Sequence, residues 1–413
     1  MEVVSPSLKG EQIKGSPSPK TIASSVKRIT SVDVYRGFVM LLMMAEVISL
    51  HSVSEALPAS GFWKFLAFNQ DHVSWVGCSL HDLIQPSFSF LVGVAVPYSI
   101  ASRMAKGQKF NSMFRHTLLR SLILILLGIF LRSMYARQTY FTFEDTLTQI
   151  GLGYTFLFVL GFQSRKVQIG SLVLILVGYW LAFALYPLPG ADFNYAAAGV
   201  QPGWNYNLHG FAAHWNKNTN LAWAFDKWFL NLFPREHPFL YNDGGYATLS
   251  FIPTLGTMIL GLIAGNILKS ELVSSKKIQQ FALIGIVLIS LALIVHFTGI
   301  NPIVKRIWTP AWVLFSGGCC FILLTFFYGV VDVYNYKKWS YPLMVIGMNS
   351  IAAYVMAHTV SSFIASSLSI HLGQNYNQLF GHPYATLVSG TLILLVEFLI
   401  LNWMYKKKIF LKI

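Results

Sequence analysis

The chain has 413 residues, of which 54% are hydrophobic, 15% aromatic and only 11% charged. Soluble domains carry about 25% charged residues, so this composition excludes an ordinary soluble domain and is typical of a protein that crosses a membrane many times. The net charge of +14 does not indicate a nucleic-acid partner, because the basic residues lie between hydrophobic runs and form no single patch.

The first 30 residues are rich in Ser, Pro and Lys and lack the apolar core of a signal peptide. We predict that residues 1–30 form a disordered cytosolic tail. Residues 31–413 are predicted to form one transmembrane domain.

Ten apolar runs are long enough, or nearly long enough, to cross about 30 Å of hydrocarbon as helices. They lie at about 33–52, 80–102, 114–135, 146–163, 168–186, 246–268, 278–298, 308–330, 340–359 and 384–405. The predicted fold class is therefore an all-α polytopic membrane protein with a bundle of about ten transmembrane helices.

The distribution of basic residues predicts the orientation of this bundle. With the N-terminus inside, 22 of the 30 Lys and Arg residues lie on the inner side and 8 on the outer side. Because cytosolic loops carry the excess of Lys and Arg, both termini are predicted to be cytosolic.

Two predicted outer connections are long, at residues 51–79 and 187–245, and long connections are often functional. The second is rich in Trp, Tyr, Asn and Gly. Aromatic faces beside amides suit a polyhydroxylated ligand such as a sugar, but an interfacial aromatic belt explains the same composition equally well.

A polar segment at the outer mouth of the first hydrophobic hairpin carries the strongest signal for chemistry. His72 can exchange a proton near neutral pH, and it precedes Asp82 and Gln85 at the start of the second predicted span. Asp82 and Gln85 are three residues apart and share one face of a helix beneath His72. A carboxylate that binds one imidazole N–H fixes the tautomer and strengthens the other nitrogen as a base. His81 points about 100° away on a helix, so it is the weaker candidate.

Polar residues in the first span are open to two interpretations. Asp33 and Arg36 are three residues apart, and a structural ion pair explains them better than catalysis does. Glu46 lies roughly 20 Å farther along the helix, near the expected depth of Asp82. It is either a site residue or a structural partner.

The ninth predicted span carries Asn349 and Ser350 at its middle and His358 near its outer end. Helix–helix hydrogen bonding is the common reason for an asparagine in a membrane, and ligand contact is the alternative. His358 alone is better explained as structural or interfacial.

A basic cluster on the inner side is explained by topology and lipid headgroups, and phosphate binding is the alternative. Its members are Arg103, Lys106, Lys109, Arg115, His116 and Arg120. The chain shows no Walker A motif, dinucleotide fingerprint or HExxH zinc motif, and its three Cys residues form no metal-binding or disulfide pattern. No metal site is predicted.

Several motifs together resemble the membrane domain of the heparan-α-glucosaminide N-acetyltransferase family. They are SVDVYRG at 31–37, HVSW at 72–75, DLIQP at 82–86, Asn-Pro at 301–302 with Trp308, VVDV at 330–333 and GMNS at 347–350. The resemblance covers nearly the whole chain after residue 30, and it rests on the ordered combination of motifs.

The resemblance implies a bundle of ten or eleven helices that uses cytosolic acetyl-CoA to acetylate a glucosamine amine across the membrane. The catalytic histidine of the family lies on the non-cytosolic side, ten residues before an aspartate, and this pattern matches His72 and Asp82. On this interpretation Asp82 orients His72, while Glu46 or Asn349 holds the thioester carbonyl or the acceptor. Arg115 and Arg120 meet the phosphates of acetyl-CoA, and Ser350 and Gln85 are further candidates for donor binding.

Two departures from the family pattern concern the site. Glu46 lies near an asparagine position of the animal members. Thr148-Gln149-Ile150-Gly151 stands where the family commonly has Gln-Arg-Ile-Gly, so an expected arginine is missing. The predicted partners are acetyl-CoA, a carbohydrate acceptor and the lipid bilayer, with a homodimer left open. A bacterial cell membrane is favoured over a lysosomal one. The alternatives are an O-acetyltransferase of an envelope glycan and a transporter or sugar- or lipid-binding membrane protein without covalent chemistry.

Overall fold

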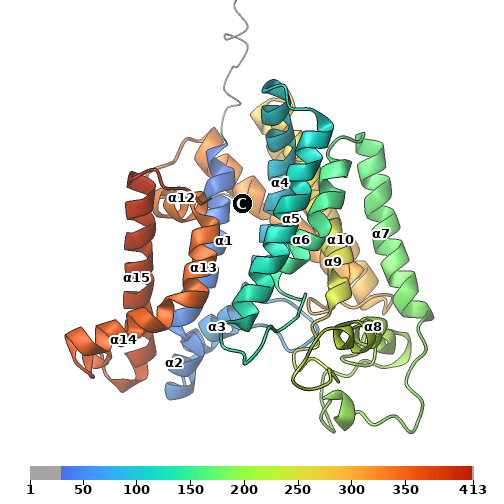
Figure 1. The fold of residues 1–413 in the computed structure, drawn as a ribbon, viewed down its shortest axis with the longest axis horizontal. Coiled ribbons are helices and arrows are strands. Elements are labelled where there is room, and N and C mark those ends of the chain that lie inside the picture. Colours follow the sequence, from blue (N-terminus) through green and yellow to red (C-terminus); the bar gives the residue numbers. More distant parts are fainter. Residues whose placement is uncertain (1–28, 412–413) are drawn as a thin grey trace, which may run out of the picture.

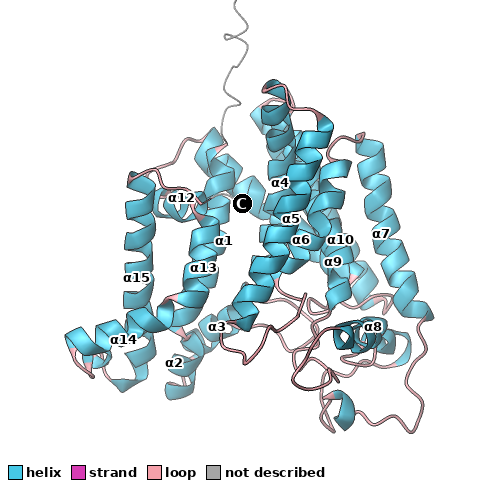
Figure 2. Cartoon of the chain, in the orientation of Figure 1, coloured by secondary structure: helices cyan, strands magenta, loops and turns pink. Residues whose placement is uncertain are grey.

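The computed structural model describes residues 29–411, and within that range the chain is helical and contains no strand (Figure 2). The predicted tail therefore lies, up to residue 28, outside the described residues. The α-helices are α1 (Thr30–Met44), α2 (Leu50–Ala56), α3 (Gly61–Gln70), α4 (Ile84–Ala105), α5 (Phe110–Ser133), α6 (Thr146–Leu160), α7 (Arg165–Leu185), α8 (Leu221–Phe229), α9 (Phe251–Lys269), α10 (Ser274–Phe297), α11 (Pro310–Phe327), α12 (Tyr341–Met348), α13 (Ser350–Thr359), α14 (Ser361–Leu372) and α15 (Ala385–Lys406).

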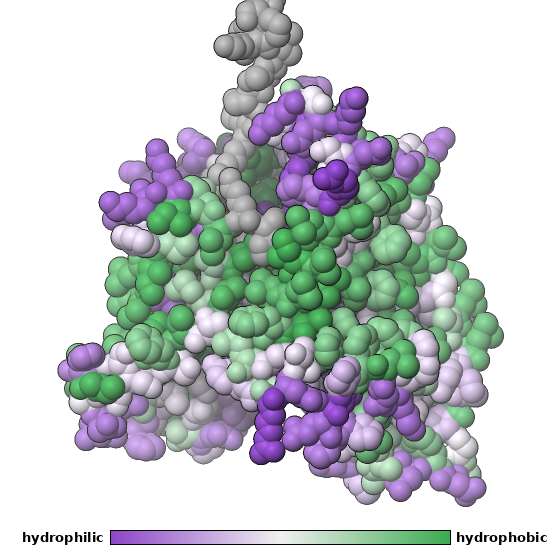
Figure 3. Space-filling view, viewed as in Figure 1, coloured by the Kyte–Doolittle hydropathy of each residue, from purple (hydrophilic) through white to green (hydrophobic). Residues whose placement is uncertain are grey.

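The helices form a bundle with two different ends. At one end α1 begins, α4 turns into α5, and α15 ends (Figure 1). We call this the basic end, because Arg103 lies in the last turn of α4, and Lys106 and Lys109 lie between α4 and α5. The other end, the loop end, holds α2, α3 and α8. A broad hydrophobic band separates hydrophilic surfaces at the two ends (Figure 3), as expected for a protein surrounded by lipid.

Seven described helices are long and apolar enough to cross a membrane, and nine spans result if each of two bent helix pairs counts as one. The seven match the predicted runs that begin near residues 80, 114, 168, 246, 278, 308 and 384. The first predicted run consists of α1 and α2, which meet at 43°. The fourth run is α6, which has only 15 residues. The helical membrane fold is confirmed, and the count of ten spans is not reached.

The prediction of one helix over residues 340–359 was wrong, because the chain breaks at Asn349. Helix α12 ends at Met348, α13 begins at Ser350, and α13 meets α14 at 61°. The Asn349 side chain donates a hydrogen bond to the Ile409 carbonyl at 3.0 Å and accepts one from the Leu411 N–H at 3.2 Å. The break is therefore coupled to the end of the described chain, which is far away in sequence.

Glycines allow the central helices to approach closely. A Cβ atom on Gly93 of α4 would overlap the Met258 carbonyl oxygen of α9, and a Cβ atom on Gly261 would overlap the Phe90 carbonyl oxygen. Such small residues bring helix backbones together in a membrane, where dispersion forces replace the hydrophobic effect as the driving force. This close pair gives the site a rigid support, because α4 carries residues of both pockets described below.

The two long outer connections are more structured than predicted. Residues 51–79 include α2 and α3, and residues 187–245 include α8. Trp75 and Trp215 are fully buried, and Trp75 donates its indole N–H to the Trp215 carbonyl at 3.1 Å. Trp204 packs edge-on against Trp75. Trp75 and Trp215 belong to a small core at the loop end, and Trp204 packs against it, so packing explains part of the aromatic content of the second connection.

Candidate functional site

The polar segment around His72 is held in place by a loop that lies more than 200 residues later. An isolated antiparallel bridge joins Val76 to Val304, and the Gly77 N–H donates to the Ile303 carbonyl at 3.1 Å. Arg306 adds a hydrogen bond to the Val73 carbonyl at 3.1 Å. Residues 71–79 and 301–309 therefore form one unit.

The conformation of residues 301–309 is fixed by hydrogen bonds at the start of α11. Thr309 caps the helix by accepting the Trp312 N–H, and its hydroxyl donates to the Pro302 carbonyl at 2.7 Å. Trp308 has a left-handed φ of 50°, and its N–H donates to the Lys305 carbonyl at 2.8 Å. This tight turn directs Lys305 toward His72.

His72 and Asp82 form a hydrogen-bonded pair, as predicted from their spacing. The distance from His72 Nδ1 to Asp82 Oδ1 is 2.8 Å. An ionised carboxylate only accepts hydrogen bonds, so Nδ1 carries the proton and Nε2 keeps its lone pair. Lys305 Nζ lies 3.5 Å from Nε2. Asp82 Oδ2 accepts the N–H groups of Val73 at 3.2 Å and Ser79 at 3.1 Å. The carboxylate is 1% exposed and His72 is 38% exposed, so the histidine is the member of the pair that a substrate can reach.

Lys305 is the third member of this cluster, and the sequence analysis missed it. Its Nζ lies 3.1 Å from Asp82 Oδ1 and 3.0 Å from His72 Nδ1, and its side chain is 4% exposed. Burial lowers the pKa of Lys305, and the Asp82 carboxylate opposes that shift. The sequence contained an indirect signal, because the Asn301-Pro302 and Trp308 motifs flank Lys305. The lysine itself entered only the count of outer charges.

These residues open into a cavity of about 280 Å³, which we call the histidine pocket. Its lining is Met40, Met43, Glu46, His72, His81, Ile84, Gln85, Phe88, Arg132, Thr146, Lys305, Tyr354 and His358. The structure thus brings together four predicted residues, His72, Asp82, Glu46 and Gln85, since Asp82 lies directly behind His72.

The expectation that His81 points away from the site was wrong. Residues His81–Leu83 form a 3₁₀ turn, and the α-helix begins only at Ile84. The His81 ring lies 4.7 Å from the His72 ring, and its Nε2 is 3.9 Å from the Glu46 carboxylate. His358, for which a structural role was preferred, also lines this pocket.

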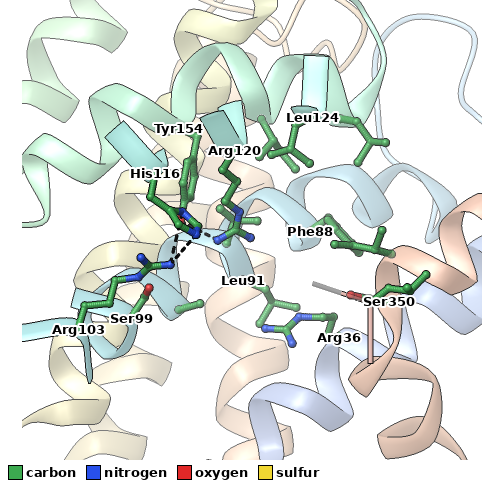
Figure 4. Close-up of a pocket in the computed structure, with 16 residues that line it drawn as sticks. Arg36, Phe88, Leu91, Ser99, Arg103, His116, Arg120, Leu124, Tyr154 and Ser350 are labelled. Carbon is green, nitrogen blue, oxygen red and sulfur yellow. Dashed lines mark hydrogen bonds between the residues drawn. The ribbon is translucent and has the colours of Figure 1, made fainter. Parts of the chain in front are cut away.

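A second cavity, of about 470 Å³, lies toward the basic end, and we call it the basic pocket (Figure 4). Figure 4 shows Arg103, His116 and Arg120 grouped at one side, with Phe88 and Ser350 away from them. Arg103 lies 3.2 Å from the His116 ring, and Arg120 donates to the Tyr154 hydroxyl at 2.8 Å. Four basic side chains, the fourth being Arg36 of α1, therefore line a largely apolar cavity.

The predicted donor-binding residues separate into two groups. Arg120 and Ser350 line the basic pocket, and Gln85 lines the histidine pocket. Arg115 is exposed and lies outside both linings. Asn349 is buried, and both polar atoms of its amide bind the backbone near the end of the described chain.

The two pockets are arranged along one face of α4 and the turn before it. His81, Ile84 and Gln85 line the histidine pocket, while Leu91, Val92, Ala95, Ser99 and Arg103 line the basic pocket. Phe88 lines both. These residues recur every three or four positions over roughly 30 Å of helix, which is about the thickness of the hydrocarbon layer. Helices α1 and α13 also contribute residues to both pockets.

The Cys78 thiol beside the site is a weak nucleophile. Burial, with a contribution from Asp82, raises the pKa of the Cys78 thiol well above its ordinary range, so the nucleophilic thiolate is disfavoured. Among residues 29–411, no group of three or more His, Cys, Asp or Glu side chains is arranged to hold a metal ion.

Comparison with known proteins gives two significant similarities. The chain is 24% identical over 456 residues to heparan-alpha-glucosaminide N-acetyltransferase from Homo sapiens, and 24% identical over 454 residues to the protein of the same name from Mus musculus. Each alignment includes the entire chain, which spans 64% of the length of each relative. No family model matches the chain. The two alignments support a distant relationship between this chain and the heparan-alpha-glucosaminide N-acetyltransferases.

Proposed function

We propose that the chain is a membrane acyltransferase that moves an acetyl group from acetyl-CoA in the basic pocket to an amino sugar or glycan at the histidine pocket. The observation that carries this proposal is the shared face of α4 and the turn before it, along which pocket-lining residues recur from His81 to Arg103 and Phe88 belongs to both linings. The names of the two relatives supply the reaction class.

The basic pocket has the chemistry expected for the charged end of the donor. Arg103 and Arg120 offer guanidinium groups that suit phosphate oxygens, and His116 lies beside them. The apolar lining beyond them, which includes Leu91 and Leu124, suits the uncharged arm that carries the thioester. On this proposal the basic end is cytosolic, in keeping with the excess of Lys and Arg on the side of the N-terminus.

His72 then acts on the acceptor at the far end of the path. Its Nε2 takes the proton from the acceptor amine or hydroxyl as the nucleophile attacks the thioester carbonyl carbon. The bond between the acyl carbon and sulfur breaks, and the thiolate of CoA receives the proton from His72. In the alternative route Nε2 attacks the thioester carbonyl carbon and the thiolate of CoA leaves. The acceptor then attacks the acetyl group on Nε2, the bond from the acyl carbon to Nε2 breaks, and the acceptor proton goes to the thiolate.

Asp82 and Lys305 are positioning residues in both routes. Asp82 holds the tautomer of His72, and it stabilises the imidazolium that forms when Nε2 takes a proton. Lys305 balances the charge of Asp82, since both side chains are buried. The acceptor approaches from the loop end, where His72 is exposed. Both N-acetylation and O-acetylation fit this geometry.

The direct test is acetyl transfer from labelled acetyl-CoA by the purified protein to a panel of amino sugars and glycans. Wild-type protein is expected to transfer label, and His72→Ala is expected to lose at least about a hundredfold in turnover, the usual contribution of a general base. His209→Ala is the matched control, because His209 is an exposed histidine of the long outer connection. Full turnover by His72→Ala would overturn the site assignment.

The competing function is transport or binding without covalent chemistry, because a polar path across the membrane also suits permeation. Thermal stability separates the two. Acetyl-CoA is expected to raise the unfolding temperature of the purified protein, because a ligand that binds only the native state stabilises it by mass action. An unchanged unfolding temperature together with absent transfer would favour the competing function.

A further inference from the structure

Phe88 lies where the two pockets meet. It is the residue that the two pocket linings share among the described residues, and its side chain is 9% exposed. Met40 and Met43 of α1 line the histidine pocket together with Phe88, and Leu91 and Leu124 line the basic pocket together with it. An aromatic ring at this point narrows the path between the cations of the basic pocket and His72.

A donor bound in the proposed way has to pass Phe88. Its phosphates stay near Arg103, which lies 15 residues along α4 from Phe88, or roughly 22 Å. The thioester has to reach His72 in the other pocket. The acyl group is the tip of the arm, so it enters a pocket of about 280 Å³ after the arm has passed the aromatic ring.

We propose that Phe88 sets the acyl-chain length that the protein accepts, and that the present path favours a two-carbon acyl group over longer ones. This inference rests on the proposed function. An acetyl group extends little beyond the thioester, whereas each further methylene has to fit into the histidine pocket, whose apolar lining includes Phe88, Met40 and Met43. The reaction is the same for every chain length: the bond from acyl carbon to sulfur breaks, the bond from acyl carbon to acceptor forms, and the thiolate takes the proton from His72.

The structure also supplies a matched control. Phe90 lies two residues away on the same helix, is fully buried, and packs edge-on against Phe321 at 5.1 Å, outside both pocket linings. Phe88→Leu and Phe90→Leu make the same chemical change on two faces of α4. Only the first change widens the path between the pockets.

The experiment measures kcat/KM with acetyl-CoA, butyryl-CoA and hexanoyl-CoA for wild-type protein, Phe88→Leu, Phe88→Ala and Phe90→Leu. The ratio of butyryl to acetyl transfer is expected to rise at least about tenfold in the Phe88 variants, and more in Phe88→Ala, because hydrophobic pockets discriminate by about this factor per methylene. Phe90→Leu is expected to keep the wild-type ratio.

Each outcome decides between the proposals. Equal effects on all three donors, or the same change of ratio in Phe90→Leu, would overturn the role of Phe88 while leaving acetyl transfer intact. If Phe88→Ala does not fold, Phe88→Leu still tests the ratio, because it retains most of the buried side-chain volume. A wild-type protein that transfers no acetyl group to any acceptor would overturn the proposed function, and the role of Phe88 with it.

Discussion

The ion pair between Lys305 and Asp82 leads to the sharpest prediction about stability. Replacing Lys305 by Met keeps an unbranched apolar side chain and removes the ammonium group. Asp82 is 1% exposed and has its Oδ1 atom 3.1 Å from Lys305 Nζ. The variant therefore leaves a buried carboxylate without its counter-charge.

The expected loss in the free energy of unfolding depends on the hydrogen bonds that Asp82 retains. Removing one partner of a buried ion pair costs about 3–5 kcal/mol in the free energy of unfolding. Asp82 keeps hydrogen bonds from His72, Val73 and Ser79, so the lower limit applies. We expect Lys305→Met to lower the free energy of unfolding by about 3 kcal/mol.

A double-mutant cycle separates the ion pair from the loss of packing. The single variants Lys305→Met and Asp82→Asn are compared with the double variant, in which no charge is left unpaired. The double variant is expected to lose about 2 kcal/mol less than the sum of the two single losses. Lys64→Met, at an exposed position on α3 at the same end of the molecule, controls for the change in net charge.

The measurement is unfolding of the purified protein in mixed micelles by a denaturing detergent, followed by tryptophan fluorescence. Additive losses, within about 0.5 kcal/mol, would refute the idea that Lys305 and Asp82 stabilise each other. The same result would remove the reason for treating Lys305 as a positioning residue of His72.

Three further predictions concern other parts of the molecule. Gly347→Ala is expected to lower the free energy of unfolding by about 3 kcal/mol, because the new Cβ would overlap the Asp33 carbonyl of α1. Gly170 faces open space on α7, so Gly170→Ala is expected to stay within about 1 kcal/mol of the wild type in the same unfolding assay. Burial raises the pKa of Asp226 from 3.8 to about 7, so the folded state binds the proton more tightly, and the free energy of unfolding of the wild type falls by up to about 4 kcal/mol as the pH rises from about 4 to about 7. Thermal unfolding at both ends of this pH range should show a smaller fall in Asp226→Asn. An equal fall in both proteins would contradict the assignment to Asp226. Arg120→Ala is expected to raise the KM for acetyl-CoA about tenfold, because it removes one charge-assisted hydrogen bond to the donor. Arg115 lies outside the pocket lining, so Arg115→Ala should leave the KM unchanged.

The helical membrane fold could be predicted from sequence because hydropathy depends on local composition. Seven apolar runs could be assigned as full-length helices without information about the helices that pack against them. The run at 340–359 failed for the opposite reason. Its break at Asn349 is coupled to hydrogen bonds with Ile409 and Leu411, which no local pattern reveals.

The candidate site shows the same contrast between residues that are close in sequence and residues that are distant. His72 and Asp82 are ten residues apart, so a motif could pair them, and their side chains are 2.8 Å apart in the structure. Lys305 is 233 residues from His72 and reaches it only because the bridge from Val76 to Val304 joins the two loops. Its charge was visible in the sequence, but its burial was not.

Phe88 shows a second kind of limit. A phenylalanine among apolar residues in a membrane span carries no signal of its own, since its residue type is the one expected there. The role proposed for it comes from its position in the linings of two cavities, each lined by several helices that are distant in sequence. Residues that react are therefore easier to find from sequence than residues that select among substrates. The former need an unusual side chain, whereas the latter need only an ordinary side chain at the narrowest point of a path.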